Sequence, residues 1–335
     1  MTRPLSQQVV VVTGASSGIG RETALQLARR GARITAVARG QHALKTLVAE
    51  VTRMGGEIHT VAGDVADPAT ADRAAAEAVE RFGRIDTWVN NAAISIYATI
   101  EDLTVDEFRR VTEVNYLGQV HGVKAALPHL RAAGGGTIIN VGSALSERAV
   151  PLQAAYCAAK HAIKGFTEAL RVEMEREDSG INVVLIEPSS MNTPLFDHAR
   201  SKAGRRPVPI PPIYEPRVTA KAILHAAEHP VAIIATGGAS KLFTAVERLN
   251  PRLLDWWQLR NDSGVSDQLG DEPDDGSDNL EQPIETAGSV TGRFGRESKA
   301  SSVYTDLFEL HPNRKAAVGL AALAGVLLAV RRLGR

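Results

Sequence analysis

Apolar residues in the first 235 positions form short runs that alternate with longer amphipathic stretches. Val9 to Val12 is a continuous β-branched run, and the stretch from Gly18 to Arg30 has helical periodicity and stops at Gly31. The same alternation predicts strands at 9–12, 33–38, 57–62, 87–89, 136–141, 182–187 and 231–235, and helices at 18–30, 41–54, 68–82, 105–132, 154–177 and 219–228. This order predicts a parallel sheet covered on both faces, a doubly wound Rossmann-type α/β fold.

The composition changes after Trp256-Trp257. Residues 261–292 contain nine acidic residues, no basic residue and little apolar periodicity, which predicts a disordered tether. Residues 293–335 are basic and include an uncharged apolar run at 316–330. We therefore expect a catalytic domain at 1–257, an acidic disordered linker at 258–303 and a basic tail at 304–335.

The apolar run at 316–330 predicts a C-terminal helix that contacts a membrane or a partner. A helix of this length is about 22 Å long, shorter than the ~30 Å hydrocarbon core of a bilayer. Arginines at both ends favour an anchor or a deep interfacial helix, and the alternative is an apolar helix docked on a partner protein.

Charge and cysteine content exclude several classes of protein. The 38 basic and 38 acidic side chains leave no net charge, so no global field attracts nucleic acid. The single cysteine, Cys157, cannot form an intrachain disulfide, and no leader precedes the first strand, so a cytoplasmic location is expected, with membrane contact only through the tail. The histidines lack ligand spacing, and no metal site is predicted.

A glycine-rich turn follows the first strand and leads into the first helix. In Thr13-Gly14-Ala15-Ser16-Ser17-Gly18-Ile19-Gly20, we expect Gly14 to allow the tight turn, Gly18 to let the backbone approach phosphates, and Gly20 to let the helix pack against the strand. This context predicts a pyrophosphate site at a helix N-terminus. The candidate cofactor contacts in this turn are Gly14, Ser16, Ser17, Gly18, Ile19 and Gly20.

Tyr156 and Lys160 lie four residues apart on a predicted helix, and Ser143 lies thirteen residues before Tyr156. Positions i and i+4 share one helix face, so the Lys160 ammonium is expected to favour the Tyr156 phenolate and to lower its pKa from about 10. Carbonyl reduction requires a held dinucleotide and an acid that delivers a proton to oxygen as hydride reaches carbon. These residues together predict a hydride-transfer site.

With Asn90-Asn91-Ala92-Ala93 and Asn115, these motifs resemble the short-chain dehydrogenase/reductase family over about residues 7–238. The resemblance implies a single-domain Rossmann fold, a nicotinamide cofactor and alcohol or carbonyl substrates. It implies that Tyr156 is the general acid/base, that Lys160 binds the nicotinamide ribose and lowers the Tyr156 pKa, and that Ser143 hydrogen-bonds the substrate oxygen. Asn115 is expected to hold a water in the proton relay behind Lys160.

The resemblance also implies further cofactor contacts and an oligomer. Its cofactor-binding positions are Asp64 and Val65 near the adenine, Asn91, Ala92, Tyr156, Lys160, Pro188 and Thr193. Asn90 is expected to stabilise the sheet around the cofactor. The chain departs from the family pattern at Ala93 and Ser189, where glycine is usual, and 195–214 is expected to form a substrate lid. Relatives assemble through the helices matching 105–132 and 154–177, so a homo-oligomer is expected.

Cofactor choice follows from the charge at the end of the second strand. Ala38 and Arg39 stand where NAD-binding proteins carry a carboxylate, and Arg21 follows the glycine turn. Two guanidinium groups and no acid favour the 2′-phosphate of NADP over NAD. The alternative is that Arg39 stacks on adenine or faces solvent.

The sequence thus predicts an NADPH-dependent reductase, or the reverse alcohol dehydrogenase, acting on an apolar or lipid-derived carbonyl. One alternative is an NADP-binding sensor or scaffold tethered to a membrane or partner, although a pure binder need not retain the acid. Epimerisation or dehydration is disfavoured because the chain lacks a large ordered C-terminal substrate domain.

Overall fold

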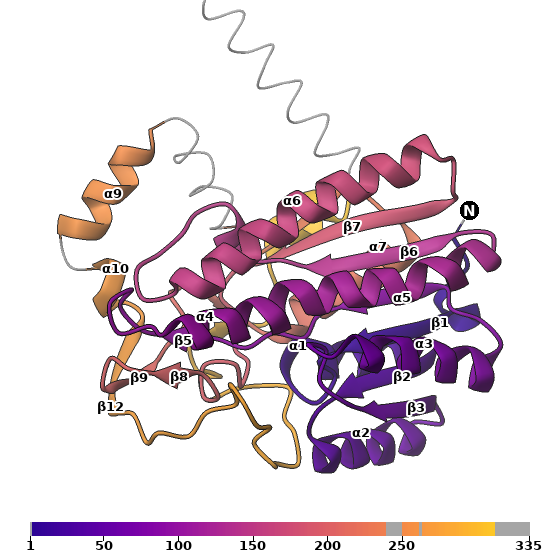
Figure 1. Ribbon diagram of the computed structural model, residues 1–335, viewed down its shortest axis with the longest axis horizontal. Coiled ribbons are helices and arrows are strands. Elements are labelled where there is room, and N and C mark those ends of the chain that lie inside the picture. Colours follow the sequence, from indigo (N-terminus) through magenta and orange to yellow (C-terminus); the bar gives the residue numbers. More distant parts are fainter. Residues whose placement is uncertain (1, 239–249, 261–262, 312–335) are drawn as a thin grey trace, which may run out of the picture.

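The computed structural model describes residues 2–238, 250–260 and 263–311. Its centre is a seven-stranded parallel sheet in the order β11-β7-β6-β4-β1-β2-β3 (Figure 1). The strands are β1 (Val9–Thr13), β2 (Arg33–Ala38), β3 (Glu57–Ala62), β4 (Thr87–Asn90), β6 (Gly136–Val141), β7 (Ile181–Pro188) and β11 (Ile233–Thr236). The doubly wound Rossmann-type fold is confirmed.

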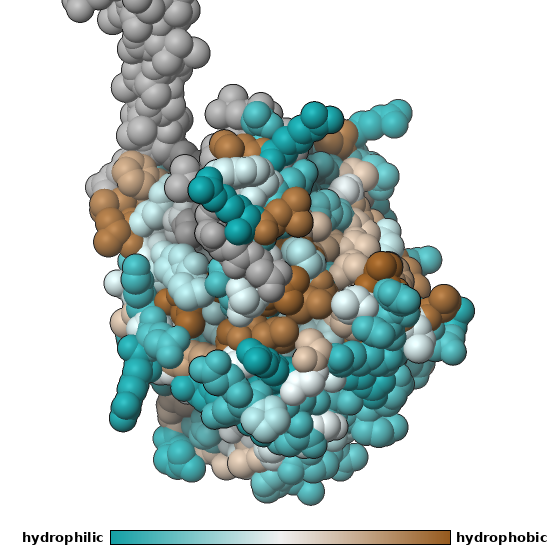
Figure 2. All heavy atoms as spheres, turned by 90° about the vertical axis from the view of Figure 1, so that its left-hand side faces the viewer, coloured by the Kyte–Doolittle hydropathy of each residue, from teal (hydrophilic) through white to brown (hydrophobic). Residues whose placement is uncertain are grey.

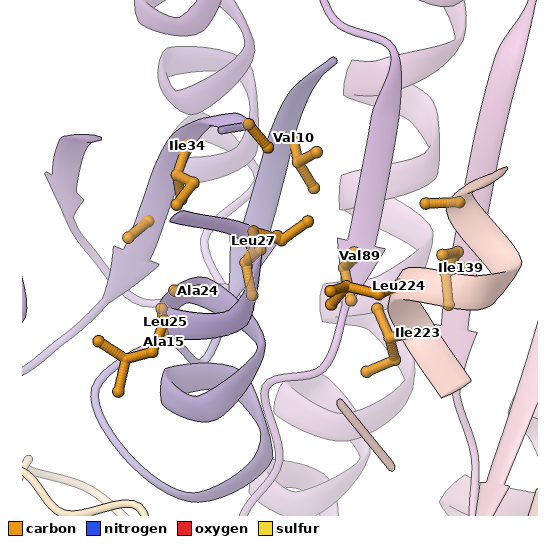
Figure 3. Packing of buried hydrophobic residues seen from close by; sticks show 14 of the residues in the cluster. Val10, Ala15, Ala24, Leu25, Leu27, Ile34, Val89, Ile139, Ile223 and Leu224 are labelled. Atoms are coloured by element: carbon orange, nitrogen blue, oxygen red, sulfur yellow. The ribbon is translucent and has the colours of Figure 1, made fainter. Parts of the chain in front are cut away.

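Helices cover both faces of this sheet because successive side chains of each strand point to opposite faces. Val10 and Val12 of β1 pack with α1 (Gly18–Arg29), α2 (Gln41–Arg53) and α7 (Pro216–Glu228) on one face, in the cluster drawn in Figure 3. Val11 packs on the other face with α3 (Pro68–Phe82), α5 (Gly118–Ala132) and α6 (Ala154–Arg176).

The chain changes winding direction between β1 and β4, which are neighbours in the sheet. Open α/β sheets bind ligands outside the carboxyl ends of the strands at such a switch point. Below it, Asn90 accepts a hydrogen bond from the Trp88 indole at 2.8 Å and donates to the Asn140 side chain of β6 at 2.9 Å. The bond to Asn140 links β4 to β6, and the bond from Trp88 fixes the Asn90 side chain within β4.

The single helix predicted at 105–132 is interrupted. α4 (Val105–Thr112) passes through a π-helical turn, η2 (Glu113–Leu117), before α5 begins. The Asn115 side chain in this turn accepts from the Ile94 amide at 2.8 Å and donates to the Ile94 carbonyl at 2.9 Å. A π-turn inserts one residue into a helix without changing its apolar spacing elsewhere, so periodicity alone does not reveal it.

Residues 263–311 pack on the catalytic domain, which differs from the disordered tether predicted within 258–303. β12 (Leu269–Pro273) pairs with β9 (Arg205–Pro207), and β13 (Ser298–Lys299) pairs with β10 (Ile213–Tyr214). The remaining small elements are η1 (Leu5–Gln7), β5 (Ile96–Tyr97), η3 (Ala144–Ser146), β8 (Arg200–Ser201), α9 (Pro251–Arg260), α10 (Ser263–Ser266) and η4 (Thr305–Glu309).

The acidic residues of this segment find basic partners on the catalytic domain. Asp278 pairs with Arg200, and Asp275 and Glu272 pair with Arg206. The predicted lid at 195–214 therefore lies beneath the acidic segment, joined to it by ion pairs and by two short pieces of sheet. Composition within 261–292 contains no information about these partners, because the arginines lie elsewhere in the sequence.

The apolar run at 316–330 lies outside the described residues. Within the ranges that the structure covers, no helix combines the length and apolarity that crossing a bilayer requires. The membrane anchor therefore stays a prediction.

We predict that Gly122→Ala destabilises the protein by about 1–3 kcal/mol. A Cβ at this α5 position would lie 2.1 Å from the Asn90 side-chain oxygen and 2.6 Å from the Trp88 indole nitrogen. Urea unfolding measures the change.

Gly165→Ala is the matched control, because a Cβ at that α6 position meets nothing within 4 Å. It is expected to leave stability unchanged or raise it by roughly 0.5–1 kcal/mol. Equal effects of the two substitutions would contradict the packing assigned to the Trp88 and Asn90 pair.

Candidate active site

A cavity of about 340 Å³ lies at the carboxyl ends of the central strands. It brings together residues that are far apart in the sequence, from the glycine turn after β1 to the loop after β7. Its lining includes the predicted residues Gly14, Ser16, Ser17, Gly18, Ile19, Arg39, Asp64, Val65, Asn91, Ala92, Ser143, Tyr156, Lys160, Pro188 and Thr193. Gly20 and Asn115 do not line it, and they support its wall from behind.

Ser143, Tyr156 and Lys160 meet in one part of this cavity. Ser143 follows β6 and accepts a hydrogen bond from the Leu145 amide at 3.1 Å, which fixes it at the start of η3. Tyr156 and Lys160 lie one turn apart on α6, and the Ser143 hydroxyl hydrogen-bonds the Tyr156 phenol. The Lys160 Nζ lies 5.4 Å from the Tyr156 ring centre and donates to the Val141 carbonyl at 2.8 Å.

Burial controls the protonation of this pair. It raises the pKa of Tyr156, and the hydrogen bond from Ser143 offsets only part of that rise. Burial also lowers the pKa of Lys160 to about 7, because a desolvated ammonium is unfavourable. The prediction that Lys160 lowers the Tyr156 pKa is therefore wrong for the structure as it stands: the lysine is itself desolvated.

The Asn115 amide bonds the Ile94 backbone and is fully buried in η2. It fixes the loop after β4, whose residues Ala93 and Ile94 line the cavity. The water-mediated link from Asn115 to Lys160 stays a prediction.

The glycine turn fits a dinucleotide. Gly14 has φ +69°, and a Cβ there would lie 2.7 Å from the Ala92 Cα. A Cβ on Gly20 would lie 2.2 Å from the Gly14 carbonyl oxygen, so glycine is required for α1 to approach the turn this closely. α1 begins after Ser17 without a side-chain cap, and its Gly18 amide donates to the Ser289 carbonyl at 2.8 Å.

The loop after β4 is tied to this turn. Asn91 donates through its side chain to the Thr13 carbonyl at 3.0 Å, and the Asn91 and Ala92 amides donate to the Thr13 hydroxyl at 3.0 and 3.2 Å. The predicted residues of both segments are therefore held in a fixed relation to each other.

The prediction that Arg21 faces the cofactor cavity is wrong. Its guanidinium is buried between α1 and α2, where it donates to the Ala43 carbonyl and pairs with Glu50 at 2.9 Å. On the first turn of α1, its side chain leaves the helix on the face packed against α2. Arg39 alone of the two cations lines the cavity.

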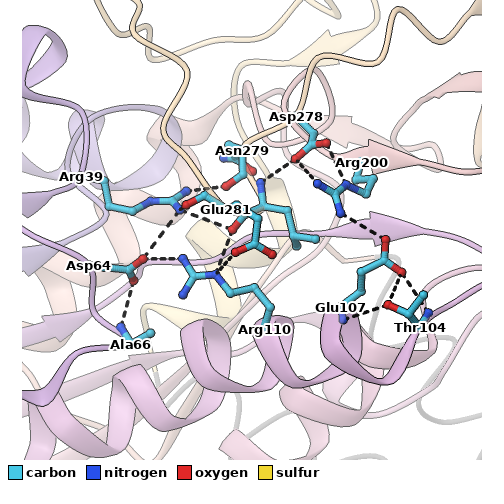
Figure 4. Close-up of polar contacts among 11 residues, drawn as sticks. Arg39, Asp64, Ala66, Thr104, Glu107, Arg110, Arg200, Asp278, Asn279 and Glu281 are labelled. Atoms are coloured by element: carbon cyan, nitrogen blue, oxygen red, sulfur yellow. Dashed lines mark hydrogen bonds and ion pairs between the residues drawn. The ribbon is translucent and has the colours of Figure 1, made fainter.

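Arg39 and Asp64 lie together at the ends of β2 and β3 (Figure 4). They are 3.8 Å apart, and Asp64 also pairs with Arg110 and accepts from the Ala66 amide. Arg39 donates to the carbonyls of Asn279 at 2.6 Å and Glu281 at 3.2 Å. The acidic segment therefore reaches the predicted cofactor site.

Several lining residues were not predicted from the sequence, among them Tyr97, Leu254 and Asn279. Tyr97 of β5 lies beside Tyr156, and the proximity of the two phenols adds to the rise that burial causes in the Tyr97 pKa. Leu254 of α9 and Asn279 reach the cavity from beyond the family-like part of the chain. Tyr97 carried no motif, and the other two depend on the unpredicted packing of residues 250–311.

A Rossmann fold in which Ser143, Tyr156 and Lys160 line one cavity with a glycine-rich turn is typical of dinucleotide-dependent oxidoreductases. The model of the short chain dehydrogenase family matches residues 8–204, and the chain belongs to this family. It is 41% identical over 255 residues to the uncharacterized oxidoreductase YxnA of Bacillus subtilis, covering 76% of this chain and 72% of that protein.

Other relatives agree with this assignment. The mouse dehydrogenase/reductase SDR family member 7B is 40% identical over 206 residues, which span 60% of this chain and 63% of that protein. An alcohol dehydrogenase of Thermococcus sibiricus, complexed with 5-hydroxy-NADP, matches with a TM-score of 0.60 at 26% identity over 68% of this chain and 95% of its own. Levodione reductase matches with a TM-score of 0.60 at 27% identity, covering 70% of this chain and 98% of its own.

We predict that the stability of the cofactor-free protein rises with pH because of Lys160. Its pKa is about 7 when folded and 10.5 in the reference state, so within this interval the unfolded chain binds more protons. Lys160→Met should be more stable than the wild type near pH 7, by on the order of a few kcal/mol, and the difference should shrink toward pH 10. Urea unfolding across this range measures it, and a pH-independent difference would contradict the burial argument.

Proposed function

We propose that this oxidoreductase is NADP(H)-dependent and transfers hydride between the nicotinamide and an apolar carbonyl or secondary alcohol. The observation that supports this best is the hydrogen-bonded Ser143 and Tyr156 pair, with Lys160 one helical turn away, in the same cavity as the glycine turn. A pure sensor or scaffold needs the turn but not this acid/base set.

Ser143, Tyr156 and Lys160 have different roles in the proposed reaction. Bound nicotinamide supplies or accepts the hydride. Ser143 donates a hydrogen bond to the carbonyl oxygen and orients it, and Tyr156 delivers the proton to that oxygen. Lys160, with a pKa of about 7, exchanges protons near neutral pH and can restore the Tyr156 proton.

The rest of the cavity favours an apolar substrate. Beyond the acid/base residues, polar side chains such as Arg148, Gln153 and His198 line part of the wall, and its apolar part includes Ile94, Leu145, Val150, Leu195, Phe196, Val208, Ile210 and Leu254. Most of these come from the predicted lid and from α9, which close the cavity on the side away from the sheet. A carbonyl on a hydrophobic body, including a lipid-derived one, matches this lining.

The outer face of α9 fits access from a membrane. Leu254 lines the cavity, whereas Leu253 and Trp256 on the same helix are about half exposed. Figure 2 looks onto this side of the molecule and shows hydrophobic patches among the hydrophilic side chains. Together with the apolar run at 316–330, this supports the proposal that the protein contacts membranes.

The proposed homo-oligomer would use α4, α5 and α6. Leu117 in η2 is 38% exposed and Val172 of α6 is 60% exposed, so these helices present apolar side chains at the surface. Burial of such residues between copies would favour association.

We predict that Tyr156→Phe still binds NADPH and lowers kcat by at least ~100-fold, since a positioned proton donor contributes about 10²–10⁴. Steady-state kinetics on a panel of hydrophobic ketones and aldehydes, combined with NADPH titration, measures both quantities. Tyr97→Phe is the matched control, because it removes a second buried phenol from the same wall. Retained turnover in the Tyr156 variant would reject the proposed acid.

We predict that Arg39→Gln lowers the ratio of kcat/KM with NADPH to that with NADH by at least about tenfold, because a charge-assisted bond to the 2′-phosphate is lost. Arg110→Gln is the control. Arg110 also contacts Asp64 and donates to the Leu280 carbonyl at 3.0 Å, but it does not line the cavity. An unchanged ratio in the Arg39 variant would exclude Arg39 as the phosphate ligand.

A further inference from the structure

Residues 278–292, which we call the strap, run along the rim of the cofactor cavity. At one end the Asp278 carboxylate accepts from Arg200 at 2.8 Å. At the other end, the Ser289 carbonyl accepts from the Gly18 amide at 2.8 Å, and the Gly292 amide donates to the Asn192 carbonyl at 3.2 Å. The strap thus crosses from the lid, past the end of β2, to the glycine turn and back to the loop after β7.

Leu280 anchors the strap. Its side chain is fully buried in a cluster with Val65 and Ile94, both of which line the cavity. The Leu280 carbonyl accepts from Arg110 at 3.0 Å. An acidic segment with one buried leucine and several charge-assisted bonds is held far more firmly than its composition indicates.

Asn279, next to this anchor, lines the cavity together with Arg39 and Asp64 (Figure 4 shows the three residues). Its backbone is held on both sides: the amide donates to the His198 carbonyl at 3.0 Å, and the carbonyl accepts from Arg39 at 2.6 Å. The Asn279 side-chain oxygen is buried and has no hydrogen-bond partner among the described residues. A buried amide oxygen without a partner is costly and calls for a ligand or a water.

We propose that the strap closes the adenosine side of the cofactor cavity and that the Asn279 side chain binds the adenosine moiety of the dinucleotide. Of the strap residues, all of which the structure describes, Asn279 alone lines the cavity. The strap therefore forms a wall of the cavity with one side chain. Its backbone carbonyls also accept hydrogen bonds from the Gly18 amide and the Arg39 guanidinium, which a bound dinucleotide would take over.

This inference rests on the proposed dinucleotide binding and extends it to the rate of exchange. A dinucleotide enclosed by the strap can leave only when Leu280 and the bonds to Arg200 and Gly18 are released. Dissociation is then coupled to a local opening of the chain, which slows it without any change at Tyr156.

The test is the binding of NADPH to the full chain, followed by energy transfer from protein tryptophan, at equilibrium and by stopped flow. Asn279→Ala is expected to raise the dissociation constant about tenfold, the value for one lost hydrogen bond to a buried group. Leu280→Ala is expected to raise the dissociation rate constant at least ~10-fold. Asp278→Ala, which removes the contacts of this carboxylate to Arg200 and to the Leu280 amide, gives the same direction of change if Leu280→Ala does not fold.

Asp275→Ala is the matched control: this exposed acid lies in the same acidic segment but outside the strap, and it contacts Arg206. Its binding and rate constants should equal those of the wild type. Unchanged NADPH affinity in Asn279→Ala would remove Asn279 from the site, and tighter binding in Leu280→Ala or Asp278→Ala would show that the strap competes with the cofactor. Either result overturns this inference alone, whereas a wild-type chain that binds neither NADPH nor NADH overturns the proposed function as well.

Discussion

The junction between β1 and the loop after β4 determines where chemistry can occur in this protein. The Thr13 hydroxyl accepts from two consecutive amides of that loop, and Asn91 donates back to the Thr13 carbonyl. These bonds fix the glycine turn beside the loop that Asn115 holds from behind. Because β6 and α6 are packed on β4, Ser143 and Tyr156 are carried to the same edge of the sheet.

The strands and most helices could be predicted because each has a distinct local pattern. β1 is a β-branched run buried on both faces, and α3 begins after the capping Asp67 and ends at Gly83 with φ +83°. The Tyr156 and Lys160 pair was equally local, since helical spacing alone brings the two residues together. Their pKa values do not follow from helical spacing, because burial by surrounding elements determines them. The sequence predicted a lowered pKa for Tyr156, whereas burial raises it.

The acidic segment shows the limit of composition as a guide to order. With few apolar residues it cannot fold alone. In the structure its carboxylates face Arg200 and Arg206 of the lid, and its backbone carbonyls satisfy Arg39. Order here depends on a complementary surface formed by residues some 70 to 240 positions earlier, so no local rule can detect it. Arg21 shows that closeness in sequence is not sufficient either. It follows the glycine turn, but its guanidinium is bound by Ala43 and Glu50 between α1 and α2.

Burial connects the two halves of the site. Desolvation favours the neutral form of both groups, so Tyr156 keeps its proton whereas Lys160 gives its proton up more readily. Asn279 of the strap, Leu195 and Phe196 of the predicted lid, and Leu254 of α9 all line this same cavity. The segment that composition assigns to a disordered linker therefore contributes Asn279 to the cavity that holds Tyr156 and Lys160.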